Sequence, residues 1–270
     1  MIVAIDTGGT KTLIVGFDKD GEVVDEIKFP TPKTPQAYTK IIRRTLFDFF
    51  GDKQVDAIAV GIPNMIKDGV ALGGGNLHWK NFNVKAALAG SLGRAPVFVE
   101  NDANLAGLAE VRQLKPLPKN ALYVTVSTGI GGGIITDGHI NPHFSTSEIG
   151  HMVIDFEGKA QRWETFGSGK AFFTKYKKYA RDIKSKRTWG QIADRISRGF
   201  LVLVPTLQPS VIIIGGSIGT YFDHFNKELT TILKKKLPSI ITVPKIIQAK
   251  NPELAVIYGC YYYALDSLAD

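Results

Sequence analysis

A strand–turn–strand pattern that occurs once in each half of the chain is the feature that most constrains how this sequence can fold. Residues 2–17 contain an apolar strand, a turn with Gly8 and Gly9, and a second apolar strand. Residues 121–135 contain the same series of features, again around a glycine-rich turn. Such turns can direct backbone N–H groups towards an anion, so the duplication indicates one anionic ligand held between two similarly built lobes.

Strands and helical segments alternate along the rest of the chain, which predicts an α/β protein. Apolar residues recur at helical spacing in segment 36–50, and further helices are predicted over 84–92, 105–111 and 254–268. Segment 114–119 holds two prolines and shows no periodicity, so we interpret it as a hinge. The predicted domains are an N-terminal lobe over 1–117, onto which 254–270 packs back, and a C-terminal lobe over 118–253.

Charge and cysteine content limit the classes of function. Lys and Arg number 33 and Asp and Glu 25, a net charge of +8 that favours anionic partners. The single cysteine, Cys260, excludes an internal disulfide and a cysteine-rich zinc module. The basic run 175–186 is interpreted as a solvated helix face, so no nucleic-acid partner is expected. No apolar run can span a bilayer and no signal peptide is visible, so we expect no membrane partner and a cytoplasmic location.

The first glycine-rich turn carries side chains suited to phosphate. Gly8 and Gly9 allow N–H groups to approach a phosphate closely, Thr10 adds a hydroxyl, and Lys11 adds a positive charge. Asp6, at the end of the preceding strand, could hold Mg²⁺ through water. A plain glycine hairpin explains this motif equally well, and the spacing is not that of a Walker A loop.

The second turn has the same chemistry. Thr128, Gly129 and Gly131 follow a strand, and a second loop of this kind favours phosphate binding over a merely permissive turn. Gly215 and Gly216 end the apolar run 211–214, where an adenine ring could lie against bare backbone. The alternative for this pair is a simple strand end.

A candidate catalytic base follows another strand. Asn101 and Asp102 come directly after the apolar run 97–100, and open α/β sheets bind ligands at strand ends. A single aspartate there could accept the proton of a hydroxyl nucleophile in phosphoryl transfer. The competing interpretation is that Asp102 caps the helix that follows.

Three further polar residues suit a polyhydroxylated ligand. Glu148, His151 and Glu164 combine two carboxylate acceptors with a ring that can both donate and accept hydrogen bonds. Taken alone, they are better explained as unrelated surface residues. A zinc site is not expected, because no second His or Cys lies at a standard ligand spacing.

Together, in this order, the motifs resemble those of the ROK family of sugar kinases, within the actin/hexokinase/Hsp70 ATPase superfamily. The resemblance runs nearly end to end and is carried by Asp6–Lys11, Gly61–Pro63, Asn76–Trp79, Glu100–Asn104, Ser127–Gly133, Glu148–Met152, Glu164 with Ser168 and Gly169, and Ile214–Gly216. It implies a two-lobed, actin-like (ribonuclease H-like) α/β fold with a central cleft.

The resemblance also implies roles for individual residues. Asp102 would be the catalytic base for a sugar hydroxyl, the 6-hydroxyl in glucokinase-like members. The implied sugar ligands are Asn76, Asn101, Asp102, Glu148, His151 and Glu164. The implied phosphate loops are 8–11 and 128–132, with Gly215 and Gly216 at the adenosine.

One departure from the family pattern concerns zinc. Family members commonly hold a structural zinc through a cysteine-containing segment before the sugar-binding glutamate. Here that segment, 156–163, is short and has no cysteine, and Arg162 stands where the last cysteine would be. We therefore expect no zinc. Short members without zinc include kinases that use polyphosphate as donor. The winged helix of the family's repressors would precede the first phosphate loop, and Asp6 lies too near the start for one.

The sequence therefore predicts a hexose kinase that uses ATP and Mg²⁺, most like a glucokinase, and a homodimer is expected. Three alternatives stay open. Polyphosphate could replace ATP, as in a glucomannokinase. The acceptor could be fructose, allose or an N-acetylhexosamine. The protein could also be a sugar sensor without catalytic activity.

Overall fold

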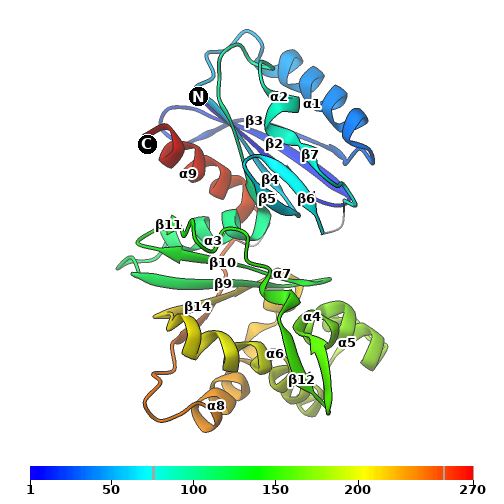
Figure 1. The fold of residues 1–270 in the computed structure, drawn as a ribbon, viewed down its shortest axis with the longest axis vertical. Coiled ribbons are helices and arrows are strands. Elements are labelled where there is room, and N and C mark those ends of the chain that lie inside the picture. The colour runs from blue at the N-terminus through cyan, green and yellow to red at the C-terminus, as the bar shows by residue number, and fades with distance from the viewer. Residues whose placement is uncertain (75–76, 252, 270) are drawn as a thin grey trace. The chain divides into compact units, whose positions relative to one another are not determined.

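Two five-stranded sheets organise the chain, one in each of two units (Figure 1). Unit 1 comprises Met1–Ala109, Pro142–Thr146 and Glu253–Asp270, and unit 2 comprises Glu110–Asn141 and Ser147–Pro252. This computed structural model describes residues 1–74, 77–251 and 253–269. No described helix is both long and apolar enough to cross a membrane.

The sheet of unit 1 has the strand order β3-β2-β1-β4-β8. Its strands are β1 (Ile2–Thr7), β2 (Lys11–Phe17), β3 (Val23–Pro30), β4 (Ala57–Ile62) and β8 (Val97–Asn101). Strands β1, β2 and β3 pair antiparallel, whereas β4 and β8 continue the sheet in parallel with β1. A smaller sheet joins β5 (Met65–Lys67), β6 (Val70–Gly73) and β7 (Phe82–Asn83).

Helices cover both faces of this sheet. They are α1 (Pro35–Phe50), α2 (Val84–Leu88), α3 (Asp102–Arg112) and α9 (Ala255–Ala269). Thr34 caps α1 by accepting the N–H of Ala37, and its buried face of Tyr38, Ile42 and Leu46 joins the core above β1 and β4. Helix α9 packs against β1 and β4 (Figure 1). Its residue Cys260 is fully buried.

The sheet of unit 2 has the order β11-β10-β9-β14-β15, again with an antiparallel meander followed by parallel strands. Its strands are β9 (Asn120–Val126), β10 (Ile130–Thr136), β11 (His139–Ile140), β14 (Val211–Gly215) and β15 (Lys245–Gln248). A separate hairpin is formed by β12 (Val153–Phe156) and β13 (Lys159–Arg162). The equal strand order of the two sheets bears out the duplication seen in the sequence.

Helices of unit 2 enclose its own core. They are α4 (Trp163–Gly167), α5 (Gly169–Tyr176), α6 (Lys186–Leu207), α7 (Gly216–Gly219) and α8 (Asn226–Lys236), with short 3₁₀ turns η1 (Ile149–His151), η2 (Ala180–Asp182) and η3 (Phe222–His224). The apolar face of α6 packs with the strands β9 and β14 and with α8. Trp163 of α4 and Trp189 of α6 are among the largest fully buried side chains.

The structure differs from the sequence-based expectation in three segments. The first unit boundary falls inside α3, after Ala109, whereas the sequence placed it at 117. Segment Pro142–Thr146 returns to unit 1, where the Asn104 side chain donates a hydrogen bond to Ser145 O at 2.7 Å. Segment 69–83, for which no regular element was predicted, contains β6 and β7, because β6 pairs with β5 on one side and with β7 on the other.

Candidate functional site

The carboxyl ends of β1, β4 and β8 bring two aspartates of unit 1 close to each other. Asp6 on β1 and Glu100 on β8 are both registered against Gly61 on β4, and Asp102 comes two residues after Glu100. Burial, and to a lesser extent the negative charge of Asp102, raise the pKa of Asp6 to about 7, although Lys28 acts to lower it. This edge of the sheet therefore holds two carboxylates that repel each other.

The raised pKa of Asp6 predicts how the stability of the protein depends on pH. The folded state binds the proton of the Asp6 carboxyl more tightly than the unfolded chain does, where the pKa of this group is about 3.8. The free energy of unfolding should therefore fall as pH rises from about 4 to 7. We expect Asp6→Asn to remove about 2–4 kcal/mol of that fall. Urea denaturation without Mg²⁺ at pH 4.5 and 8 measures it. An equal pH dependence in the two proteins would contradict the assignment.

Asn101, rather than Asp102, caps helix α3. The Asn101 Oδ1 atom accepts hydrogen bonds from the N–H groups of Ala103, at 2.8 Å, and of Asn104, at 3.2 Å. Its Nδ2 atom donates to Asn64 O at 3.1 Å, which fixes the orientation of the amide. Asp102 is the first residue of α3, with Oδ1 2.8 Å from the Ala103 N–H. The capping role considered for Asp102 is thus filled by its neighbour.

Asn64 is a positioning residue that the sequence reasoning missed. It is buried, and besides accepting the bond from Asn101 it accepts from Gly73 N–H at 2.7 Å and donates to Trp79 O at 3.4 Å. The available signal was a polar residue two positions after the end of β4 at Ile62. Asn76, predicted to bind sugar, lies outside the described residues.

The first glycine-rich turn is held by the strand beside it. Gly8 N–H donates to Lys11 O at 3.0 Å, which closes the turn between β1 and β2. Thr31 Oγ1 donates to Gly8 O at 2.7 Å, and Lys33 Nζ lies 3.4 Å from Gly9 O. The predicted phosphate residues Thr10 and Lys11 are exposed. The backbone of the turn is therefore fixed while these two side chains face solvent.

In unit 2, the turn between β9 and β10 lies beside Glu164. Ser127 N–H donates to Gly129 O at 2.9 Å, and Gly169 N–H donates to Ser127 O at 2.7 Å. A Cβ atom on Gly129 would lie 2.9 Å from Glu164 Oε2, so the backbone of this turn approaches the carboxylate closely. Gly131 belongs to β10, paired with Thr125, and is not part of the turn itself.

The structure brings together the three polar residues that the sequence separated. His151 Nε2 lies 3.2 Å from Glu164 Oε1. Burial raises the pKa of Glu148; His151 acts to lower that pKa and Glu164 to raise it. Gly150 permits this arrangement, because a Cβ atom there would lie 2.1 Å from Ile130 O on β10. Glu148, His151 and Glu164 thus form one cluster, which we call the Glu–His–Glu cluster.

No group of three or more His, Cys, Asp or Glu side chains that could hold a metal occurs within the described ranges. Segment 156–163, where the resemblance implied missing zinc ligands, contains the turn of the β12–β13 hairpin and the start of α4. Glu164 follows it directly and contacts His151, so the short segment still brings this glutamate to the Glu–His–Glu cluster.

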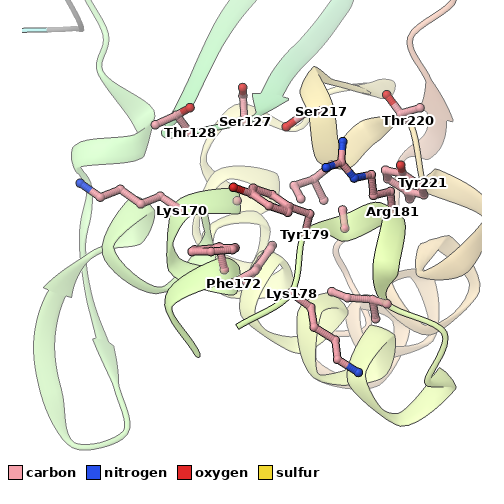
Figure 2. Close-up of a pocket in the computed structure, with 15 residues that line it drawn as sticks. Ser127, Thr128, Lys170, Phe172, Lys178, Tyr179, Arg181, Ser217, Thr220 and Tyr221 are labelled. Carbon is pink, nitrogen blue, oxygen red and sulfur yellow. The ribbon is translucent and has the colours of Figure 1, made fainter. Parts of the chain in front are cut away.

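A cavity of about 500 Å³ lies next to the turn at Thr128 (Figure 2). Figure 2 shows Tyr179 and Arg181 beside this cavity, with the Arg181 guanidinium on the side of Ser217. The guanidinium lies 5.0 Å from the Tyr179 ring centre. The lining residues include three cations, Lys170, Lys178 and Arg181, and no Asp or Glu is among the described residues that line it.

The basic run 175–186 is not the solvated helix face that the sequence predicted. Helix α5 ends at Tyr176, and Lys177 has φ of 55° in the left-handed region, so the chain turns there. The following segment folds back through η2 and places Tyr179 and Arg181 at the cavity. The sequence around Lys177 contains no glycine or proline that would have predicted this change of direction.

The predicted adenosine residues line a second cavity. Gly215 and Gly216, at the end of β14 and the start of α7, line a space of about 420 Å³. Thr220 lines both this space and the cavity beside Thr128. The two spaces are therefore neighbours beside α7.

Comparison with known proteins gives one consistent result. The model of the ROK family matches residues 2–267. An N-acetylmannosamine kinase of Vibrio cholerae serotype O1 is 28% identical, covering 90% of this chain and 92% of that protein. The structure of an inorganic polyphosphate/ATP-glucomannokinase from Arthrobacter sp. strain KM has a TM-score of 0.74 at 26% identity, covering 98% of each chain.

A further solved structure confirms the predicted fold. A ROK family glucokinase from Streptomyces griseus, in complex with glucose and AMPPNP, has a TM-score of 0.80 at 21% identity. The match covers 98% of this chain and 99% of that one. The predicted actin-like α/β fold is therefore confirmed.

Proposed function

The chain belongs to the ROK family, and we propose that this carbohydrate kinase is a hexose kinase most like a glucokinase. It would transfer the γ-phosphoryl group of ATP to a sugar hydroxyl, most simply the 6-hydroxyl. The single observation that carries the proposal is the edge of the unit 1 sheet where Asp102 follows β8 and interacts with Asp6. One carboxylate at such a strand end is the recurring base of phosphoryl transfer.

Asp102 would act as the base in this reaction. As the sugar oxygen attacks the γ-phosphorus, the hydroxyl proton passes to the Asp102 carboxylate, and ADP leaves on the opposite side. Asn101 keeps Asp102 at the first position of α3, because its own side chain satisfies the helix N–H groups. The transfer needs no covalent enzyme intermediate.

The sugar would be recognised by the polar residues that the family resemblance implies. Asn101 would donate from Nδ2, and Asn76 would contribute a second amide. Glu148 and Glu164 would accept hydrogen bonds from sugar hydroxyls, and His151 would donate to or accept from another. The 3.2 Å contact between His151 and Glu164 supports this role, since paired side chains lose less entropy on binding a ligand.

The donor would lie along the two glycine-rich turns. Gly8, Gly9, Thr10 and Lys11 would hold phosphate from unit 1. Thr128, Gly129 and Gly131 would do so from unit 2, with Gly215 and Gly216 beside the adenosine.

The residues present fit a divalent cation. Asp6 and Asp102 offer oxygen atoms of the kind that Mg²⁺ prefers. Burial, and then the nearby charge of Asp102, raise the pKa of Asp6, and a bound cation would act to lower it. When bound with ATP, Mg²⁺ would offset the charge of the phosphate oxygens. Asp6 would hold it through water.

A kinase assay over glucose, mannose, fructose, allose and N-acetylhexosamines, each with ATP and with polyphosphate, tests the proposal. Glucose with ATP is expected to give the highest kcat/KM. Fastest transfer to another sugar would replace the assigned acceptor. Tight sugar binding without transfer to any hexose would favour the sugar sensor instead.

A second candidate uses polyphosphate as donor. The observation in its favour is the cavity beside Thr128, lined by Lys170, Lys178 and Arg181 with no acidic residue among its described lining. The positive electrostatic potential of these three side chains would attract the negative charges all along a polyphosphate chain. A nucleotide base is neutral and would not be attracted in this way.

Tyr179→Ala should separate the two donors. If the adenine of ATP stacks on Tyr179, losing the ring costs about 1–3 kcal/mol, which raises the KM for ATP about 5- to 150-fold. The KM for polyphosphate should stay within about 2-fold. Lys184→Ala is the matched control, because Lys184 is exposed in the same segment and is not among the residues lining the cavity. Steady-state kinetics with each donor measures both; an unchanged KM for ATP would contradict a base at Tyr179.

A further inference from the structure

Glu164 lies on a helix that is too short to be stable by itself. Helix α4 has only five residues, Trp163–Gly167, and its N-cap, Arg162, makes no side-chain capping bond. Helices this short are not stable in isolation, so tertiary contacts must fix the direction of the Glu164 carboxylate. The contacts that do so lie on the side of α4 facing helix α6.

Trp163 is the first of these contacts. It is fully buried, and its backbone N–H donates to Met152 O at 2.9 Å. Its ring Nε1 donates to Arg195 O on α6 at 3.3 Å. The beginning of α4 is therefore joined both to the end of η1, which carries His151, and to α6.

Arg195 is the second contact and joins two segments at once. Its side chain is buried; Nη1 donates to Phe166 O on α4 at 3.2 Å, and Nη2 lies 3.2 Å from Glu157 Oε1 in the β12–β13 turn. The guanidinium also lies 4.7 Å from the ring centre of Phe156, which stacks on Phe166 at 4.2 Å. One buried cation thus ties the end of α4 to the hairpin.

A lysine could not make the same set of bonds. The planar guanidinium donates in fixed directions to a carbonyl and a carboxylate while lying on an aromatic face. Burying this charge costs free energy unless its N–H donors are hydrogen-bonded. The bonds to Phe166 O and Glu157 therefore stabilise the buried position of Arg195, and the same bonds hold α4 and the hairpin in place. These bonds join Arg195, α4 and the hairpin without a metal ligand.

We propose that Arg195 is a positioning residue for sugar recognition: from helix α6 it fixes α4, and so aims Glu164 at His151 and Gly129. The inference rests on the proposed function of Glu164 as a sugar ligand. Arg195 itself would not touch the sugar. Its loss should therefore weaken sugar binding more than it weakens donor binding or the chemical step.

Helix α6 supplies a matched control. Arg198 lies one turn further along, and its guanidinium is 5.7 Å from the same Phe156 ring. Its Nη2, however, lies 3.0 Å from both carboxylate oxygens of Asp194 on its own helix. Arg198→Met removes a cation over Phe156 and leaves the bonds between Arg195 and α4 intact.

The test compares Arg195→Met with Arg198→Met. For Arg195→Met, we expect the sugar KM and the calorimetric sugar Kd to rise about 10-fold or more, the range for a broken buried charged hydrogen bond. The donor KM should stay within about 2-fold and kcat should fall less than the sugar affinity. Arg198→Met should leave the sugar Kd within about 2-fold, and Arg195→Lys should give an intermediate value.

A second measurement does not depend on the proposed function. In the ligand-free protein, the amide NMR signal of Gly129, which lies beside Glu164, should move in Arg195→Met and stay in Arg198→Met. Wild-type protein that binds no hexose would overturn the proposed function while this signal still tests the positioning role.

Two results would overturn the inference: an unchanged Gly129 signal and sugar Kd in Arg195→Met, or equal losses in both arginine variants. If Arg195→Met does not fold, Arg195→Lys carries the test, and an unchanged sugar Kd there also overturns it.

Discussion

Asp102→Asn is expected to lower kcat about 10³-fold while sugar affinity changes no more than about 3-fold. General-base catalysis by a positioned carboxylate contributes about 10²–10⁴-fold, and an asparagine cannot accept the proton. The amide has nearly the same shape, so the hydrogen-bonding surface offered to the sugar is largely kept. The start of α3 should also persist, because Asn101 caps it.

Single-turnover assays with ATP, together with calorimetric titration of glucose, measure the two quantities separately. Asn101→Ala is the informative companion variant. It removes the cap and the bond to Asn64, so it should lower both stability and sugar affinity. Near-normal kcat in Asp102→Asn would remove Asp102 from the role of base.

Gly199→Ala is expected to destabilise the protein by about 3 kcal/mol or more and to abolish high-affinity sugar binding. A Cβ atom at this position of α6 would lie 2.2 Å from the ring of Trp163, which is fully buried and cannot move aside. Overpacking of this kind typically costs about 1–3 kcal/mol, and here the obstacle is a rigid indole. Displacing Trp163 also displaces Glu164, the next residue.

Gly190→Ala on the same helix is the matched control. A Cβ atom there meets nothing within 4 Å, so the substitution should be neutral or stabilise α6 by up to about 1 kcal/mol through helix propensity. Urea denaturation of both variants gives the stability difference, and glucose titration gives the binding. Equal stabilities for the two variants would show that Trp163 can yield, and would weaken its role as an anchor for α4.

Local sequence patterns carried much of the fold. The strand–turn–strand units predicted at 2–17 and 121–135 occur as β1–β2 and β9–β10, because apolar runs and glycine content are properties of neighbouring residues. The helix predicted over 36–50 agrees with α1 to within one residue for the same reason. The hairpin β12–β13 was missed, since its residues are partly polar and its turn, at Glu157 and Gly158, is short.

The same distinction between local sequence patterns and long-range packing applies to the candidate site. The sequence by itself determined which residues can do chemistry: the aspartate after a strand, the two glycine-rich turns, and the glutamates and histidine suited to hydroxyl groups. Only the tertiary structure decided which of them meet and what holds them. His151 contacts Glu164, Asn101 takes the capping role from Asp102, and Arg195 reaches α4 from thirty or so residues away. Such contacts depend on how helices and strands pack. The periodicity of a local segment contains no information about which distant residues will pack against it.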